Sequence, residues 1–242
     1  MKYLIFSDIH SNLEALETAF SFFEKSSIDK FIFLGDVVGY GANPNEVIKL
    51  LRRLSPLNCL AGNHDWAVIE KFPLTYFNPL AYEAITWTKR ILTKENFGFL
   101  HTFPLIYQEK DFVCVHGSLF EPDNFHYIMD ARSAYLNFSL QNKKICFIGH
   151  THCREIYILK EDKIYFSRGD YVELEDDAKY IFNVGSIGQP RDGDNRLCFC
   201  IYDDKEKVVK FVRLDYCVEK AAKKILKVGL PSFLASRLYR GM

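Results

Sequence analysis

The sequence lacks an excess of charge of either sign, because its 242 residues include 31 basic and 31 acidic side chains. Zero net charge argues against a protein that binds nucleic acid or anionic membranes through bulk electrostatics. No apolar run approaches the roughly 20 residues that span a membrane. The start, MKYLIFSDIHSN, has too short an apolar stretch for a signal peptide. We therefore expect a cytoplasmic protein with neither a membrane nor a nucleic acid as its partner.

The sequence also lacks any C-x-x-C pair, although it contains seven cysteines. This pattern argues against both a disulfide framework and a cysteine-bound structural zinc. Cys198 and Cys200 lie two residues apart in a β-rich run, so a strand would place both on one face. Packing in the core is the favoured interpretation of this pair, and a metal site is the alternative.

What the sequence does contain is a series of short β-rich apolar runs, at 3–6, 31–34, 57–61, 112–115, 145–148, 156–159, 180–184, 197–202 and 208–214. Amphipathic helical patterns separate the first three runs, one opened by a capping box at Ser11–Glu14 and one by Asn43 and Pro44. Alternating strands and helices predict βαβ units in a parallel sheet. The later strands follow one another without helices, which predicts an antiparallel or mixed second sheet. We interpret 1–242 as one α/β domain.

Two segments have a helical pattern outside these units. Residues 66–100 are rich in aromatics, which indicates a helical layer over a sheet face or, alternatively, the lining of a substrate cleft. The tail at 216–242 opens with an amphipathic helix whose apolar face is formed by Val218, Ala221, Ala222, Ile225 and Leu226. Its lysines (Lys220, Lys223, Lys224 and Lys227) are expected to be solvated, and a membrane or nucleic-acid role for them is the less favoured alternative.

Polar side chains follow five of the predicted strands directly. The motifs are Asp8-x-His10, Gly35-Asp36, Gly62-Asn63-His64-Asp65, His116-Gly117 and Gly149-His150-Thr151-His152. In α/β sheets, ligands bind at the carboxyl ends of the strands, so these loops are expected to converge. Seven candidate ligands from these motifs have oxygen or nitrogen donors and none is a thiolate, which suits two divalent ions such as Mn, Fe, Zn or Ni. They are Asp8, His10, Asp36, Asn63, His116, His150 and His152. Two metals about 3.5–4 Å apart are the arrangement used to hydrolyse phosphoesters.

These motifs, read as SDIH, GDVVGYG, GNHD, VHGS and GHTH, resemble the calcineurin-like metallophosphoesterase superfamily. The strings DIHSNLEAL, GDVVGYGANPNEVI, NVGSIGQPRDG and GLPSFLASRLYRG are similar to a prokaryotic subgroup of diadenosine-tetraphosphatase-like and serine/threonine-phosphatase-like phosphoesterases. The resemblance covers nearly the whole chain. It implies a four-layer sandwich, in which two mixed β-sheets are flanked by helices. It also implies a metal-dependent hydrolase of phosphoric esters that acts on a small phosphorylated substrate.

The resemblance assigns roles to individual residues. One divalent ion (Mn, Fe, Zn, Ni or Mg) would be held by Asp8, His10, Asp36 and His152. The second would be held by Asp36, Asn63, His116 and His150, so that Asp36 is shared. A hydroxide bridging the metals would attack phosphorus in line. His64 would contact the phosphate beside Asn63 and protonate the leaving oxygen, and the adjacent Asp65 would keep the imidazole protonated.

The chain departs from the wider family at two positions. Gly39 stands where many members have a second aspartate in G-D-x-x-D, so no further carboxylate is expected. Trp66 follows the GNHD motif where protein phosphatases have arginine, which counts against protein phosphatase activity.

Several other polar residues have two interpretations each. Arg191 is a candidate for binding phosphate or for a salt bridge that fixes its loop, and Arg154 for binding phosphate or for a surface role. Asn12 is expected to cap the first helix rather than to face phosphate. His101 is interpreted as a loop or surface residue, and His126 as a residue that could border the cleft.

Three functions are consistent with these features. The favoured one is hydrolysis of a phosphomonoester, a phosphodiester or a nucleotide. The alternatives are a metal-free protein-interaction scaffold of the same fold and a nuclease. The complete ligand set counts against the scaffold, and zero net charge counts against the nuclease.

Overall fold

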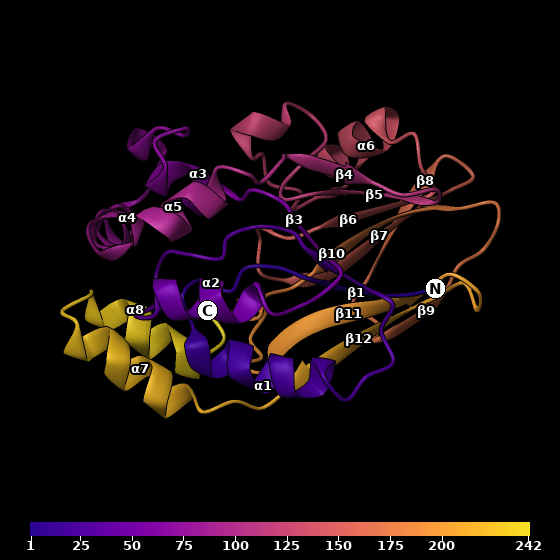
Figure 1. Cartoon of the computed structure of the whole chain (residues 1–242). Coiled ribbons are helices and arrows are strands. Elements are labelled where there is room, and N and C mark those ends of the chain that lie inside the picture. The colour runs from indigo at the N-terminus through magenta and orange to yellow at the C-terminus, as the bar shows by residue number, and fades with distance from the viewer.

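The computed structural model describes all 242 residues, and its two β-sheets lie face to face between layers of helices (Figure 1). The first sheet has the order β3 (Leu57–Cys59), β2 (Lys30–Phe33), β1 (Lys2–Phe6), β11 (Leu197–Asp203), β12 (Val208–Leu214), β9 (Tyr171–Glu173). The second has the order β4 (Ile106–Gln108), β5 (Phe112–Val115), β6 (Ile145–Ile148), β10 (Lys179–Val184), β7 (Arg154–Lys160), β8 (Lys163–Ser167). The expected pair of mixed sheets is confirmed.

Helices cover the outer faces of both sheets. The first sheet is covered by α1 (Leu13–Phe23) and α2 (Pro44–Leu51), and the second by α6 (Ala131–Leu140) (Figure 1). The remaining helices gather beyond the ends of the sheets, at the left in Figure 1. They are α3 (Asn63–Val68), α4 (Pro79–Ile91), α5 (Lys94–Leu100), α7 (Val218–Lys227) and α8 (Ser232–Ser236). The fold is therefore the four-layer sandwich expected from the sequence.

Parallel pairing brings the loops after several strands to the same edge. β1, β2 and β3 are parallel neighbours, as the βαβ pattern predicts, and antiparallel β11 extends their sheet. In the second sheet, β5, β6 and β10 are parallel neighbours. Because parallel strands end at the same edge of a sheet, the motifs that follow them lie near one another.

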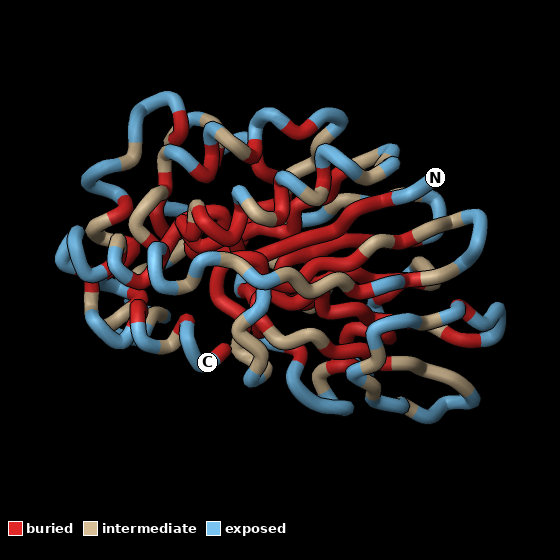
Figure 2. Tube along the Cα trace, turned by 90° about the horizontal axis from the view of Figure 1, so that it is seen from below, coloured by how far each residue is buried: buried red, intermediate tan, exposed pale blue.

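Strand alternation divides the apolar side chains between the layers. On β1, Tyr3 and Ile5 face the second sheet, whereas Leu4 and Phe6 pack against α1. Figure 2 shows that the strands form a continuous buried centre beneath an exposed outer surface. Burying one large apolar side chain contributes about 1.5–3 kcal/mol, so this centre supplies most of the driving force for folding.

Cys198 and Cys200 lie in the core between the sheets, which confirms the packing interpretation. All seven thiols are free. None of the helices is long and apolar enough to cross a membrane.

The start of α1 differs from the prediction. Its N-cap is Asn12, whose Oδ1 accepts a hydrogen bond from the Ala15 amide at 3.2 Å, so the capping box at Ser11–Glu14 is wrong. Ser11 is instead in a left-handed conformation with φ of 55°, and its Oγ is buried without a hydrogen-bond partner, so it caps no helix amide. The capping role expected for Asn12 is confirmed, and α2 begins at Pro44 as predicted.

The C-terminal tail packs as an amphipathic helix, with two corrections. Ala221, Ala222 and Ile225 are buried as predicted, but Leu226 is 53% exposed. Lys220, Lys223 and Lys227 are exposed as predicted, but Lys224 is only partly exposed. Lys224 and Lys220 lie 2.6 and 3.4 Å from a carboxylate oxygen of the buried Glu14 on α1. A buried carboxylate needs a cation nearby, and α7 supplies two.

We expect Lys224→Ala to lower the free energy of unfolding by about 1–3 kcal/mol, because Glu14 would lose its nearer cation while remaining buried. Urea denaturation monitored by circular dichroism measures the change. Lys227→Ala on the same helix serves as the control, because Lys227 is exposed and forms no ion pair. This substitution should change stability by less than about 0.5 kcal/mol. Equal effects of the two substitutions would show that the Glu14 pair does not anchor α7.

Candidate metal centre

The loops that follow β1, β2, β3, β5 and β6 bring all seven candidate ligands into one buried cluster. Each ligand side chain is less than 10% exposed, in the set Asp8, His10, Asp36, Asn63, His116, His150 and His152. The residues are up to 144 positions apart in the sequence, so their proximity depends on strand pairing. The structure thus brings together every residue that the motifs nominate.

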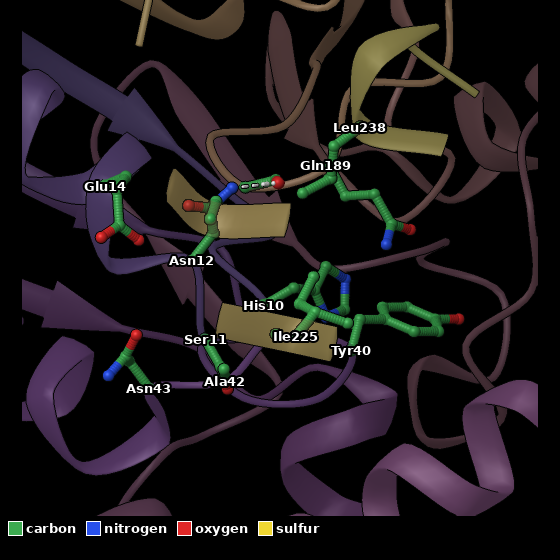
Figure 3. A pocket seen from close by; sticks show the side chains of 13 residues that line it. His10, Ser11, Asn12, Glu14, Tyr40, Ala42, Asn43, Gln189, Ile225 and Leu238 are labelled. Carbon is green, nitrogen blue, oxygen red and sulfur yellow. Dashed lines mark hydrogen bonds between the residues drawn. The ribbon is translucent and has the colours of Figure 1, made fainter. Parts of the chain in front are cut away.

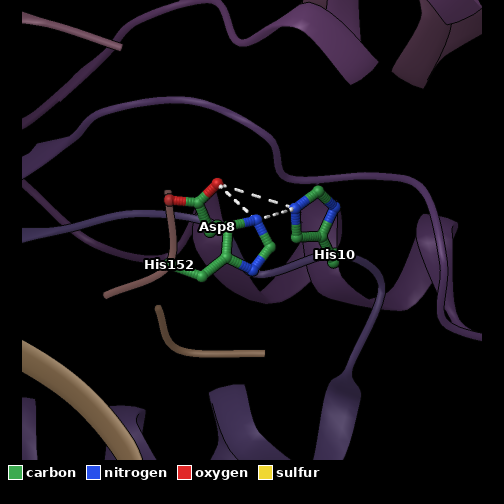
Figure 4. Close-up of side chains that lie close together, drawn as sticks. All are labelled: Asp8, His10 and His152. Atoms are coloured by element: carbon green, nitrogen blue, oxygen red, sulfur yellow. Dashed lines mark hydrogen bonds and ion pairs between the residues drawn. The ribbon is translucent and has the colours of Figure 1, made fainter. Parts of the chain in front are cut away.

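One group of ligand atoms is formed by Asp8, His10 and His152 (Figure 4). The Oδ1 atom of Asp8 lies 3.2 Å from Nε2 of His152 and 3.6 Å from Nε2 of His10. The two imidazole Nε2 atoms are 3.1 Å apart. Three donors converging on one point in this way match the tri-ligand pattern of a metal site.

A second group is formed by Asp36, His116 and His150. The Oδ2 atom of Asp36 lies 3.4 Å from Nε2 of His116 and 3.5 Å from Nε2 of His10. Asp36 therefore stands between the two groups, the position expected for a shared ligand. His64 also lies within reach of His10 and Asp36, a third grouping that the motifs do not predict.

Backbone carbonyl groups orient three of the imidazoles. The Nδ1 atoms of His10, His116 and His152 lie 2.9, 2.9 and 2.6 Å from the carbonyl oxygens of Val38, Leu34 and Gln189, respectively. A ring nitrogen that contacts a carbonyl oxygen carries the proton, which leaves the Nε2 lone pair for a cation. All three Nε2 atoms point into the cluster.

Left-handed backbone places the ligands. Five of the seven have positive φ angles, namely Asp8, His10, Asp36, His150 and His152. Such conformations are uncommon for residues other than glycine, and each costs of order 1–3 kcal/mol, so the surrounding packing must impose them. At Gly62 a side chain would overlap the carboxylate of Asp36, so only glycine permits this approach.

The donor set fits divalent cations. Asp8 Oδ1, Asn63 Oδ1 and His116 Nε2 are buried without a hydrogen-bond partner. Burial alone would raise the pKa of Asp8, but the neighbouring imidazoles hold it well below its usual range. Burial lowers the pKa of His150 and His152 to about 3, so both rings are neutral at neutral pH, the form that ligates metals.

His64 and Asp65 differ from the predicted pair. The Asp65 carboxylate accepts hydrogen bonds from the backbone amides of Asp36, Val37, Val38 and Gly62 at 2.7–3.3 Å, and not from His64. The interpretation that Asp65 keeps His64 protonated is therefore wrong. Its role is structural, because it ties the loop after β2 to the start of α3.

The His64 ring is held by aromatic neighbours instead. It packs against the rings of Tyr40 and Phe77 with centroid separations of 4.5 and 5.0 Å. Its Nδ1 is buried without a partner, and burial lowers the pKa of the imidazole well below its usual value. Gly39 lies so close to this ring that no side chain fits there, which explains why the chain carries no second aspartate in G-D-x-x-D.

Arg191 lies beside the cluster with no carboxylate within ion-pair distance. Its Nε and Nη2 donate to Oε1 of Gln189 at 3.2 and 2.7 Å, and its guanidinium lies 5.5 Å from the centre of the Tyr40 ring. The salt bridge that fixes this loop belongs to Asp192, which pairs with Arg213. Arg154 pairs with Asp170, away from the ligands.

Sequence reasoning missed Arg237, which reaches the same place from the C-terminal tail. Its guanidinium lies 5.9 Å from the centre of the Tyr40 ring, and burial together with Arg191 lowers its pKa to about 10. Figure 3 shows Ile225 and Leu238 of the tail lining a cavity together with His10 and Tyr40. No local motif marks Arg237, because its proximity to the cluster arises from helix packing alone.

Residues 66–100 form a helical layer, as predicted, and part of the segment also lines a cleft. Ile85 and Leu100 are buried in the core as parts of a helical layer. Phe72, Tyr76 and Phe77, from the segment around the short helix η1 (Leu74–Tyr76), line a cleft that also contacts Asn63 and His150. His126 borders this cleft, and His101 is exposed as expected.

Comparison with known proteins identifies the class of this chain. Residues 1–207 match the model of the calcineurin-like phosphoesterase superfamily domain, and the chain belongs to this family. It is 40% identical to the uncharacterized protein MJ0912 of Methanocaldococcus jannaschii, over 98% of this chain and 97% of that protein. The similarity extends beyond the family domain into the C-terminal tail.

Two solved structures share the fold over the full length. A metallophosphoesterase from Sphaerobacter thermophilus has a TM-score of 0.86 and 36% identity, covering 100% of this chain and 99% of that one. The hypothetical protein PH1004 from Pyrococcus horikoshii OT3 has a TM-score of 0.82 and 19% identity, covering 100% and 98%, which shows the fold alone. The resemblance inferred from the motifs is confirmed at the level of the superfamily.

We expect Asp65→Asn to lower the free energy of unfolding by about 2–4 kcal/mol, because the amide nitrogen would face two backbone N–H groups that the carboxylate now satisfies. Urea denaturation in the presence of a chelator measures this cost without a contribution from bound metal. Asp123→Asn, which alters an exposed aspartate without side-chain hydrogen bonds, is the control. Wild-type stability of Asp65→Asn would contradict the structural role assigned to this carboxylate.

Proposed function

We propose that this protein is a phosphoesterase that depends on two divalent metal ions and hydrolyses a small phosphomonoester, phosphodiester or nucleotide. The observation that carries the proposal is the pair of His/Asp triads, each with its ligand atoms within 4.8 Å of one another, placed side by side around Asp36. Membership of the phosphoesterase family supports the proposal. So do the buried atoms Asp8 Oδ1, Asn63 Oδ1 and His116 Nε2, which have no hydrogen-bond partner and could bind a cation.

In this proposal, Asp8, His10, Asp36 and His152 hold one ion, and Asp36, Asn63, His116 and His150 hold the other. Two bound divalent ions supply Lewis acid activation of the phosphoryl group and a hydroxide nucleophile near neutral pH. The chain contributes the fixed orientation of the donors through the carbonyl contacts of the imidazoles. The chain also buries these donor side chains, which keeps bulk water away from them.

His64 is the proposed proton donor to the leaving oxygen. Its backbone amide donates to Asp36 Oδ1 at 2.8 Å, which fixes the residue at the start of α3 beside the ligands. Tyr40 and Phe77 restrict the orientation of the ring. A bound phosphate dianion would raise the affinity of the buried imidazole for a proton, because it adds negative charge close to the ring.

Arg191 and Arg237 are proposed to contact phosphate oxygens on the Tyr40 side of the cluster. Both guanidinium groups lie against one tyrosine ring, and no aspartate or glutamate is paired with either. Arg237 Nε donates to the main-chain oxygen of Met242 at 2.5 Å, and Arg191 lies near enough to repel it. An anion between the two guanidinium groups would relieve that repulsion. Asn63 and His64 are proposed to contact the same substrate, with the His64 ring packed against Tyr40 between the arginines and the cleft that Asn63 lines.

We expect wild-type protein reconstituted with Mn²⁺ and then desalted to retain two ions per chain by elemental analysis. Asp36→Asn should retain fewer than one, because the substitution weakens the only ligand that both sites share. His101→Asn, which removes an exposed histidine outside the cluster, should match the wild type. Retention of no more than trace metal by the wild-type protein, with Mn²⁺ or with Zn²⁺, would refute the proposal and favour a metal-free scaffold.

His64→Ala should keep both ions and lower kcat for an alkyl phosphate by about 10²- to 10⁴-fold, the usual contribution of a general acid. The loss should be much smaller for p-nitrophenyl phosphate, because nitrophenolate leaves readily without a proton. Steady-state kinetics on the two substrates, with metal content measured on the same samples, separates loss of the acid from loss of metal. Full activity of the variant on the alkyl phosphate would exclude His64 as the acid.

A further inference from the structure

A cleft of about 370 Å³ opens directly beside the candidate metal centre. Two candidate ligands, Asn63 and His150, form one end of it. Most of the remaining wall is aromatic, formed by Phe72, Tyr76, Phe77, Phe125 and Tyr127. This volume lies within the range of roughly 300–1,000 Å³ for small-molecule sites, so the cleft can accept part of a substrate whose phosphate sits at the ligands.

Three aromatic rings of the cleft pack against imidazoles of the cluster. Tyr127 stacks on His150 with ring centroids 3.9 Å apart and planes inclined by only 12°. Phe125 makes an edge contact with His116 at 5.9 Å, and Phe77 makes one with His64 at 5.0 Å. A planar group bound in this cleft would therefore be continuous with the reacting centre rather than remote from it.

Local structure holds these rings in place before any ligand binds. Phe72 stacks on Tyr76 with ring centroids 5.2 Å apart, and it makes an edge contact with Phe125 at the same separation. The segment that carries Phe72 and Tyr76 therefore contacts the loop that carries Phe125. Across the cleft, the Glu121 carboxylate lies 3.0 Å from Nδ2 of Asn124 and 3.2 Å from Nε2 of His126. These contacts tie together the loop that carries Phe125 and Tyr127, so little ordering is required on binding.

Exposure and charge indicate what kind of group the cleft accepts. Tyr76 and Tyr127 are 75% and 50% exposed although both carry large apolar rings. No lysine, arginine, aspartate or glutamate lines the cleft, in contrast to the arginine pair beside Tyr40. A second phosphate would find no cationic side chain in the wall of this cleft, whereas a neutral planar ring would gain stacking surface from the tyrosines. Asn124 and His126 at the rim offer polar atoms to the edge of such a ring.

We propose that this cleft binds the nucleobase of a nucleotide substrate, with its phosphate directed to the candidate ligands. The assignment rests on the proposed phosphoesterase function and narrows its substrate class to nucleotides. Aromatic stacking on a base contributes about 5- to 100-fold in affinity per ring, and it tolerates different bases because every base has a π-face. The cleft therefore selects for the presence of a base more than for its identity.

Adenosine 5′-monophosphate and ribose 5-phosphate test the assignment, because they share the same ester bond and differ only in the base. We expect the wild-type, Mn²⁺-loaded protein to favour the nucleotide by at least about tenfold in kcat/KM. Tyr76→Ala and Tyr127→Ala should each reduce this ratio by about 5-fold or more, mainly through KM, whereas Tyr76→Phe should preserve it. Tyr135→Ala, which removes an exposed tyrosine on α6, is the matched control and should leave the ratio at its wild-type value.

A wild-type ratio near one, or a ratio that neither alanine variant changes, would overturn the assignment. If neither ester is hydrolysed, equilibrium dialysis of adenosine against the metal-loaded protein decides the question independently of catalysis. Saturable binding of adenosine that Tyr76→Ala weakens would support the cleft assignment even where the proposed hydrolysis fails. Absence of adenosine binding would exclude a base site.

Discussion

The burial of two carboxylates, Asp8 and Asp36, is the constraint on which the rest of the structure depends. Both side chains are almost completely buried, and neither has a lysine or arginine partner. Their negative charge is opposed only by imidazoles and backbone amides, an arrangement that is costly without further cations. Two divalent ions would supply the missing charge. The zero net charge of the sequence therefore gives no sign of this local site, which would become positive with the two proposed divalent ions.

Placing these groups requires backbone that an unconstrained chain avoids. Asp8, Asp36 and three of the histidine candidate ligands occupy left-handed conformations, and the close approach of Gly62 to Asp36 leaves no room for a side chain. The buried Asp65 carboxylate offsets part of this cost by satisfying four amides at the junction of two ligand loops. Strain concentrated at a site and compensated by its supporting contacts is the usual sign of a functional geometry.

The surroundings of the cluster differ on its two sides. A neutral aromatic cleft lies beside Asn63 and His150, whereas Arg191 and Arg237 lie beside Tyr40 near His10 and His64. His64 contacts both environments, since its ring packs against Phe77 on one side and Tyr40 on the other. In the proposed function, this asymmetry would orient a substrate that combines a planar apolar part with a phosphate, because only one orientation matches both surfaces.

The sequence by itself determined the strand and helix pattern of the first sheet, the burial of Cys198 and Cys200, and the seven polar residues at strand ends. These features are encoded locally, through residue periodicity and short motifs that read the same in any context. Only the tertiary structure decided that the Asp65 carboxylate accepts hydrogen bonds from backbone amides and not from the His64 ring. The same holds for the ion pair of Lys224 with the buried Glu14, and for the positions of Tyr127 and Arg237 beside the site. Each of these depends on contacts between segments far apart in the chain, whose energies no local pattern records, because packing and burial arise only once the layers have assembled.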